Sequence, residues 1–231
     1  MIRVEIRDGV HVLAFARPPV NAVNVELAEA FHAAVDALVD ARACRAVVLT
    51  GDRRSFCAGI DNREVPTYDP ATRARMLRTI NRTIRSLYGL AKPVVAAVSG
   101  HAIGAGLVVA ITSDFRVVAR GAFKLGLTEA AAGIPFPAAP LAICRAELSP
   151  RALRVLALGS EAYPPEAPEL GEIVDRLVDP DDLLDVAIGE AKRRAEIAAY
   201  GRVKLQVRAN TIARLHEIVE KDDEPLFDRW T

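Results

Sequence analysis

Short apolar runs alternate along the chain with longer segments in which apolar residues recur every three or four positions. Apolar and polar residues alternate through residues 2–15 around Asp8-Gly9, which predicts a β-hairpin. Compact apolar runs predict buried strands at 44–51, 92–100 and 115–119. Helical spacing predicts helices at 25–42, 71–90, 107–113, 151–158, 181–200 and 204–219. This order of strands and helices predicts an α/β fold with crossover connections.

The composition narrows the class of protein. The chain has 231 residues, of which 51% are apolar, so it is long enough to bury a substantial core. With 30 basic and 30 acidic residues, it has no charge excess that would indicate binding to nucleic acid or to an acidic membrane. The three cysteines are not spaced as disulfide or metal ligands, the charged N-terminus does not resemble a signal peptide, and the longest apolar stretch is too short to span a bilayer. We therefore expect a cytoplasmic protein.

Two turns of small residues follow two of the buried runs. The segment SFCAGID, residues 55–61, follows one, and GHAIGAG, residues 100–106, follows the next. Small residues allow a ligand to approach the backbone, and N–H groups at a helix start are free to donate. Two converging turns would stabilise an oxyanion, an interaction that contributes about 3–4 kcal/mol per donor in a transition state. Alternatively, both turns are only tight connections. Dinucleotide binding is weakly indicated, because Val109 stands where the third glycine of that motif is needed.

Glu129 is the candidate acid or base. It lies in the segment GLTEAAAGIPFP, between Leu127 and a run of alanines. Apolar surroundings raise the pKa of a carboxyl group, which suits proton transfer near neutral pH. The alternative interpretation is an ordinary solvated glutamate in a loop.

Five collinear segments together resemble the crotonase family, the enoyl-CoA hydratase/isomerase superfamily. They are RPPVNAVNVEL, SFCAGID, KPVVAAVSGHAIGAGLVVAITSDFRV, FKLGLTEAAAGIPFP and LALGSEAYPPEAPELGEIVDRLVDPDDLLDVA. The resemblance implies an α/β spiral of ββα units with a helical C-terminal appendix. It also implies an acyl-CoA-binding core over 1–187 and a helical region over 188–231 that takes part in trimerisation or pocket closure. A homotrimer or a dimer of trimers is expected.

The resemblance also assigns roles to residues. The backbone N–H groups of Ile60 and Ala105 would bind the thioester oxygen of an acyl-CoA, and Glu129 would be the catalytic carboxylate. Ala105 stands where the family usually has glycine. Contacts with the substrate or with its coenzyme A part are expected at Asn21, Ala22, Cys57, Ala58, Gly59, Asp61, Gly104 and Val108. No metal and no cofactor besides the coenzyme A of the substrate is implied.

One departure from the family pattern bears on the reaction. Hydratases of the family carry a first glutamate at the position of Val108, so only Glu129 remains of the usual pair. GLTE also resembles the G-L-N-E stretch of the Δ3,Δ2-enoyl-CoA isomerases. The pattern therefore favours a shift of the double bond of a 3-enoyl-CoA to the 2-position. The alternatives are a 2-enoyl-CoA hydratase (a lyase), for which Glu64 could supply a second carboxylate, a non-catalytic acyl-CoA-binding paralogue, and, remotely, a nicotinamide dehydrogenase.

Several charged residues have less specific interpretations. The resemblance places Lys204 and Arg208 where they could reach the coenzyme A of a neighbouring subunit. Asp61 and Asp114 match positions interpreted mainly as structural. The arginines that recur between residues 73 and 85 are interpreted as the solvated face of an amphipathic helix.

Overall fold

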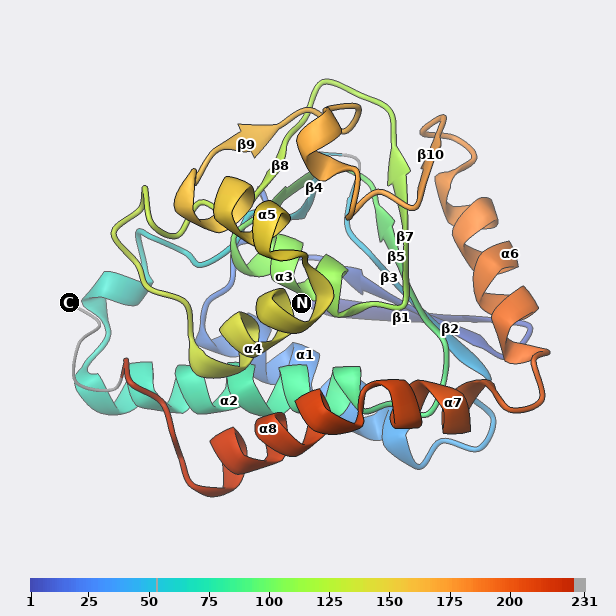
Figure 1. Ribbon diagram of the computed structural model, residues 1–231, viewed down its shortest axis with the longest axis horizontal. Helices are drawn as coiled ribbons and strands as arrows, with labels where there is room; N and C mark the ends of the chain where they lie inside the picture. Colours follow the sequence, from blue (N-terminus) through green and yellow to red (C-terminus); the bar gives the residue numbers. More distant parts are fainter. Residues whose placement is uncertain (53, 227–231) are drawn as a thin grey trace.

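A six-stranded sheet forms the centre of the molecule (Figure 1). The computed structural model describes residues 1–52 and 54–226. The strands of this sheet, in spatial order, are β1 (Ile2–Arg7), β2 (Val10–Phe15), β3 (Ala46–Thr50), β5 (Val94–Val98), β7 (Phe115–Ala119) and β10 (Arg176–Val178). Only β1 and β2 pair antiparallel, around the predicted Asp8-Gly9 turn, and the other neighbours are parallel. Every residue of β3 and β5 is buried, which explains their continuous apolar runs.

A second sheet of short strands lies beside the first. It consists of β4 (Ser55–Cys57), β6 (His101–Ile103), β8 (Leu125–Gly126) and β9 (Ala162–Tyr163), in that spatial order. The first three of these strands each follow a strand of the main sheet and precede a helix, namely α2 (Pro70–Tyr88), α3 (Ala105–Thr112) and α4 (Ala138–Glu147). The chain thus repeats three ββα units, which confirms the predicted spiral.

Helices cover the sheets and complete the core. Helix α1 (Val25–Val39) packs along α2, and α6 (Leu183–Ala195) covers one face of the main sheet at β3, β5 and β7 (Figure 1). Helix α3 is buried along most of its length at the centre of the molecule. No helix within residues 1–52 and 54–226 is long and apolar enough to cross a membrane.

The structure differs from the sequence-based expectation both before and after residue 150. Helix α4 and the short strands of the second sheet were not predicted. The helix predicted at 151–158 divides into α5 (Pro150–Leu153) and a π-helix, η2 (Arg154–Leu158). Two 3-10 turns, η1 (Val65–Thr67) and η3 (Pro168–Leu170), were not predicted. The helix expected at 181–200 is α6, which is shorter. It spans the expected boundary between the core (1–187) and the C-terminal helical region (188–231), and that boundary stays a prediction. The helix expected at 204–219 is two helices, α7 (Tyr200–Val207) and α8 (Ala209–Glu220).

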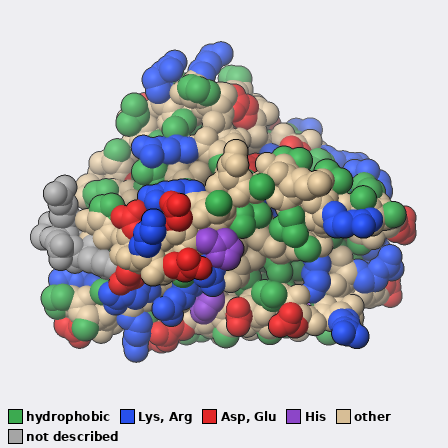
Figure 2. All heavy atoms as spheres, turned by 60° about the horizontal axis from the view of Figure 1, so that its bottom comes forward, with side chains coloured by type: hydrophobic (Ala, Val, Ile, Leu, Met, Phe, Trp, Pro, Cys, Tyr) green, Lys and Arg blue, Asp and Glu red, His purple; other side chains and the backbone are tan. Residues whose placement is uncertain are grey.

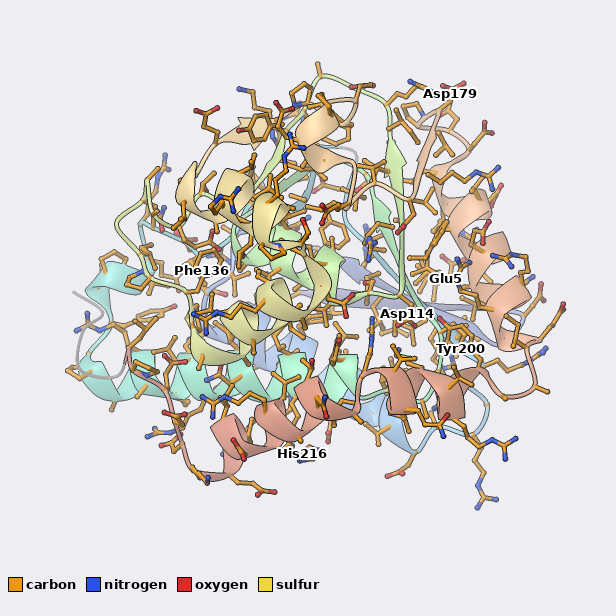
Figure 3. All side chains as sticks on the ribbon, viewed as in Figure 1. Glu5, Asp114, Phe136, Asp179, Tyr200 and His216 are labelled. Atoms are coloured by element: carbon orange, nitrogen blue, oxygen red, sulfur yellow. The ribbon has the colours of Figure 1, made fainter. Side chains whose placement is uncertain are left out.

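Buried charges account for the break between α7 and α8. Arg208 has non-helical backbone angles, φ −92° and ψ 2°, and its guanidinium stacks on the ring of Tyr88 at 3.9 Å. Arg208 and Lys204 both pair with Asp114, each at 2.9 Å, and both are more than nine-tenths buried. Figure 3 shows Asp114 lying near Tyr200, between the sheet and α7. The charges of Lys204 and Arg208 thus have partners inside this chain, and their contact with the coenzyme A of a neighbouring subunit stays a prediction.

The arginines of α2 lie on a surface of mixed charge. Figure 2 brings this side of the molecule forward and shows basic and acidic side chains interspersed over it. Arg75 pairs with Glu29, and Arg78 pairs with Asp222. These ion pairs agree with the interpretation of a solvated helix face.

Candidate active site

The first small-residue turn holds Ile60 beside the segment that precedes α1. Gly59 has a φ of +82°, a conformation that L side chains rarely adopt. The N–H of Val23 donates to the carbonyl of Gly59 at 2.7 Å, and the N–H of Asp61 donates to the carbonyl of Val23 at 2.9 Å. In a parallel bridge of this kind the residue between the two bonded positions turns its own N–H away from the partner strand. The N–H of Ile60 therefore points away from Val23.

The second small-residue turn ends at the first residue of α3. Gly104 has a φ of +52°, and α3 begins at Ala105. A residue in the first turn of a helix has no intrahelical acceptor for its N–H. The N–H of Ala105 is thus a free donor by its position.

The two turns are in direct contact, and glycine makes the contact possible. A Cβ atom added to Gly106 would lie 2.0 Å from the carbonyl oxygen of Cys57, which no real side chain allows. A Cβ atom added to Gly59 would lie 2.7 Å from the Ile103 oxygen and 3.6 Å from the Ala105 nitrogen. The segments that carry the two candidate donors are therefore packed backbone to backbone.

Glu129 lies over the second turn. The N–H of Gly104 donates to the carbonyl of Gly126 at 2.8 Å, which brings the end of β8 to this turn. A Cβ atom added to Gly104 would lie 3.3 Å from Oε1 of Glu129. Oε2 of Glu129 is buried, and it has no hydrogen-bond partner among the described residues. Burial raises the pKa of Glu129 to about 7, so at neutral pH its carboxyl group can both accept and return a proton.

The other carboxylates near Ile60 are fully engaged. Oδ2 of Asp61 accepts from Nη1 of Arg17 at 2.8 Å, and Oε2 of Glu64 accepts from Nη2 at 2.6 Å. Hydrogen bonds from Tyr68 and Asn24, with the charge of Arg17, lower the pKa of Glu64. Burial by itself would raise the pKa of Asp61, but the bonds from Arg17 and from nearby backbone N–H groups lower it overall. Both carboxylates thus stay ionised and hydrogen-bonded to Arg17.

Val108 stands in an apolar wall one turn after Ala105. It is 1% exposed and lines a cavity of about 50 Å³ between α1, α2 and α3. Ala105 and Cys57 line the same cavity, together with the apolar side chains Phe15, Val23, Leu27, Ala28, Phe31, Ile80, Ile84, Val109 and Pro140, and with Thr83. A second cavity, of about 260 Å³, reaches Ile60 from the side of the 132–134 loop. The small-residue turns therefore have an apolar cavity on one side and a wider, more polar one on the other.

The remaining predicted site residues have clear structural partners. The amide nitrogen of Asn21 donates to the carbonyls of Ser55 at 2.9 Å and Phe56 at 3.3 Å, and the carbonyl of Ala22 accepts from Arg17 at 2.9 Å. The N–H of Ala58 donates to the carbonyl of Val20 at 3.1 Å. Burial raises the pKa of Cys57 to about 12, so its thiol is neutral and packs as an apolar group. Contacts of these residues with a ligand stay predictions.

The structure thus brings the two turns, Val108 and Glu129 together, and it adds a residue that the sequence reasoning missed. Arg17 contacts both Ala22 and Asp61, and it is the first residue of the segment RPPVNAVNVEL, in which the resemblance gave it no role. No local pattern identifies it, because its partners Asp61 and Glu64 are 44 and 47 residues away. Among the described residues, no group of three metal-ligating side chains comes together.

Comparison with known proteins identifies the family. The family model described as enoyl-CoA hydratase/isomerase matches residues 5–228. A probable enoyl-CoA hydratase of Mycobacterium avium is 33% identical over 186 residues, which cover 80% of this chain and 72% of that protein. Human mitochondrial enoyl-CoA delta isomerase 1 is 30% identical over 220 residues, which cover 93% of this chain and 72% of that protein.

Solved structures show the same relationship. That of human mitochondrial delta3-delta2-enoyl-CoA isomerase superimposes with a TM-score of 0.86 at 29% identity, covering 96% of this chain and 88% of the other. That of a probable enoyl-CoA hydratase of Mycobacterium tuberculosis also gives 0.86, at 25% identity, covering 96% and 94%. The chain belongs to the enoyl-CoA hydratase/isomerase family.

Proposed function

We propose that this member of the family is an enoyl-CoA isomerase that moves the double bond of a 3-enoyl-CoA to the 2-position. One observation carries the proposal. Glu129 has a buried oxygen without a partner beside the small-residue turns, whereas position 108 is a valine within an apolar wall. One unpaired carboxylate is sufficient for a proton shift.

The reaction follows from these groups. The carboxylate of Glu129 removes a proton from C2 of the 3-enoyl thioester, and the C2–H electron pair forms a dienolate whose charge is on the thioester oxygen. The N–H groups of Ile60 and Ala105 donate to that oxygen as the charge develops. Glu129 then returns the same proton to C4, which leaves the double bond between C2 and C3. The reaction consumes no water and needs no second carboxylate.

Hydration of a 2-enoyl-CoA requires more catalytic groups than the proton shift does. It needs a group to activate water in addition to a group that protonates C2. Asp61 and Glu64 are the other carboxylates near Ile60, and Arg17 pairs with both. Their lowered pKa values make them poor bases, which supports isomerisation over hydration.

The test uses the absorbance of the conjugated enoyl thioester. We expect absorbance to rise when the protein meets 3-hexenoyl-CoA and to stay constant with 2-hexenoyl-CoA. Glu129→Gln should abolish the rise. Glu196→Gln, at an exposed position at the end of α6, is the matched control and should leave it unchanged. A fall in absorbance with 2-hexenoyl-CoA would indicate hydration instead. Binding of both esters without any change would indicate a non-catalytic acyl-CoA-binding protein.

A further inference from the structure

We propose that Arg17 is a positioning residue that holds the N–H of Ile60 in place for the thioester oxygen. The inference rests on the proposed function, in which that N–H is one of two oxyanion donors. Arg17 is not placed in contact with the substrate. It acts through the segment that carries the donor.

The guanidinium of Arg17 binds three acceptors from two segments of the chain. Nη1 donates to the carbonyl of Ala22 at 2.9 Å and to Asp61 at 2.8 Å, and Nη2 donates to Glu64 at 2.6 Å. The Arg17 side chain is only 20% exposed, and that of Asp61 is 16% exposed. A planar guanidinium with several donors suits such an arrangement, whereas an ammonium group is a single point charge.

This link acts next to the donor. Asp61 follows Ile60 directly, and its other oxygen accepts from the N–H groups of Arg63 at 3.1 Å and Glu64 at 3.2 Å. The Asp61 side chain therefore closes the turn that follows Ile60 and fastens it to Arg17. Rotation of the Ile60 N–H requires movement of the adjoining peptide, which this arrangement opposes.

The two donors differ in how they are held. The N–H of Ala105 belongs to the first turn of α3, which is buried and packed against Cys57 through Gly106. The N–H of Ile60 lies in a turn outside any helix or extended strand, and a single bridge to Val23 supports it from behind. The direction of the Ile60 N–H thus depends on the two backbone hydrogen bonds with Val23 and on the side-chain contacts of Asp61, which Arg17 supports.

The expected effect is on catalysis more than on binding. Displacement of a reacting group by about 1 Å can cost about 100-fold in rate. Arg17→Lys keeps the charge but cannot bind three acceptors in one plane. We expect this variant to lower kcat about 10- to 100-fold while KM changes by about threefold or less.

A vibrational measurement separates positioning from general loss of structure. The probe is hexanoyl-CoA labelled with ¹³C at the thioester carbonyl, which binds without reacting. In the wild-type protein the carbonyl stretch should move to lower frequency on binding, and in Arg17→Lys this shift should be clearly smaller. Arg193→Lys, in an exposed ion pair on α6, is the matched control and should keep the full shift.

A second variant covers the case in which Arg17→Lys does not fold. Asp61→Asn preserves size and breaks the same link from its other end, so it should reduce the carbonyl shift and kcat in the same direction. In the double variant the two effects should be less than additive, because both variants remove the contact between Arg17 and Asp61.

The outcomes distinguish the two proposals. A full carbonyl shift in folded Arg17→Lys and Asp61→Asn would overturn the role of Arg17 and leave the proposed function intact. The absence of any shift in the wild-type protein with bound hexanoyl-CoA would overturn the oxyanion donors themselves, and with them both proposals.

Discussion

Carboxylates on the two sides of the small-residue turns have opposite surroundings. Glu129 has a buried oxygen with no partner, and burial raises its pKa to about 7. Glu64 accepts hydrogen bonds from Tyr68, Asn24 and Arg17, and its pKa is lowered. Identical side chains are thus suited to different tasks. The glutamate whose buried Oε2 has no partner among the described residues can exchange a proton at neutral pH, whereas the glutamate bound by three side chains supports the local structure.

The largest difference is expected in turnover. Replacement of each glutamate by glutamine removes its charge and keeps its size. Glu129→Gln should lower kcat for 3-hexenoyl-CoA by about 10²–10⁴-fold, the usual contribution of a general base. Glu64→Gln should lower it about tenfold or less, because it disturbs only the support of the turn. Equal losses in the two variants, measured by absorbance at saturating substrate, would show that the comparison is wrong.

Glu129→Gln, which should lower turnover, should raise the stability of the folded protein. Glu129 has a folded pKa above its ordinary value of 4.5, so the folded state favours its protonated form. The contribution of Glu129 to the free energy of unfolding is fully present below about pH 4 and is lost as the pH rises towards about 7. Glu129→Gln should therefore raise the free energy of unfolding at pH 8 by about 2 kcal/mol, a value reduced from the full shift because the side chain is partly exposed.

Denaturant unfolding of both proteins at pH 8 and at the lowest pH at which both stay folded measures this difference. The gain should shrink as the pH falls. If Glu129→Gln is inactive but more stable than the wild type, the carboxylate of Glu129 serves catalysis at a cost in stability. A gain that is the same at every pH would instead mean that Glu129 titrates normally.

The pH dependence of the reaction gives a smaller, graded effect. Because the base must be ionised, kcat/KM should fall about tenfold per pH unit below a midpoint near pH 7 and level off above it. Thioester absorbance in overlapping buffers measures the profile. A midpoint near pH 4.5, the ordinary value for a glutamate, would mean that the carboxyl group is solvated when the enzyme works.

The sequence predicted those parts of the molecule that depend on local pattern. The buried runs predicted β3, β5 and β7 of the main sheet, and the alternating pattern predicted β1 and β2, whereas β10 was not predicted. The small residues at 55–61 and 100–106 lie in two turns that the structure packs together at Gly59 and Gly106, and the approach of a ligand to them stays a prediction. Apolar neighbours of Glu129 correctly indicated a raised pKa. In each case the signal lies within the segment concerned, although the contacts themselves join segments that are distant in the sequence.

The parts that the sequence did not predict depend on contacts between distant residues. The resemblance places Lys204 where it could reach a neighbouring subunit, whereas its ammonium group pairs with Asp114, 90 residues earlier, inside this chain. The helix ends at Arg208 because its side chain reaches Asp114 and Tyr88. Arg17 was missed for the same reason, since nothing near it in the sequence shows that Asp61 and Glu64 complete its surroundings.

The smallest expected effect is that of Asp61, a carboxylate paired with Arg17, on the free energy of unfolding. The pKa of Asp61 is lowered in the folded state, so its ion pair with Arg17 contributes stability above the ordinary pKa of 3.8, and this is lost as the pH falls through the folded value. Asp61→Asn should therefore lower the free energy of unfolding at pH 7 by about 1 kcal/mol, and the difference from wild type should vanish in acid. Glu129→Gln changes stability with the opposite sign over a higher pH range. If both variants responded to pH in the same direction, burial and pairing would not be what separates these carboxylates, and the assignment of Glu129 as the proton carrier would lose its physical basis.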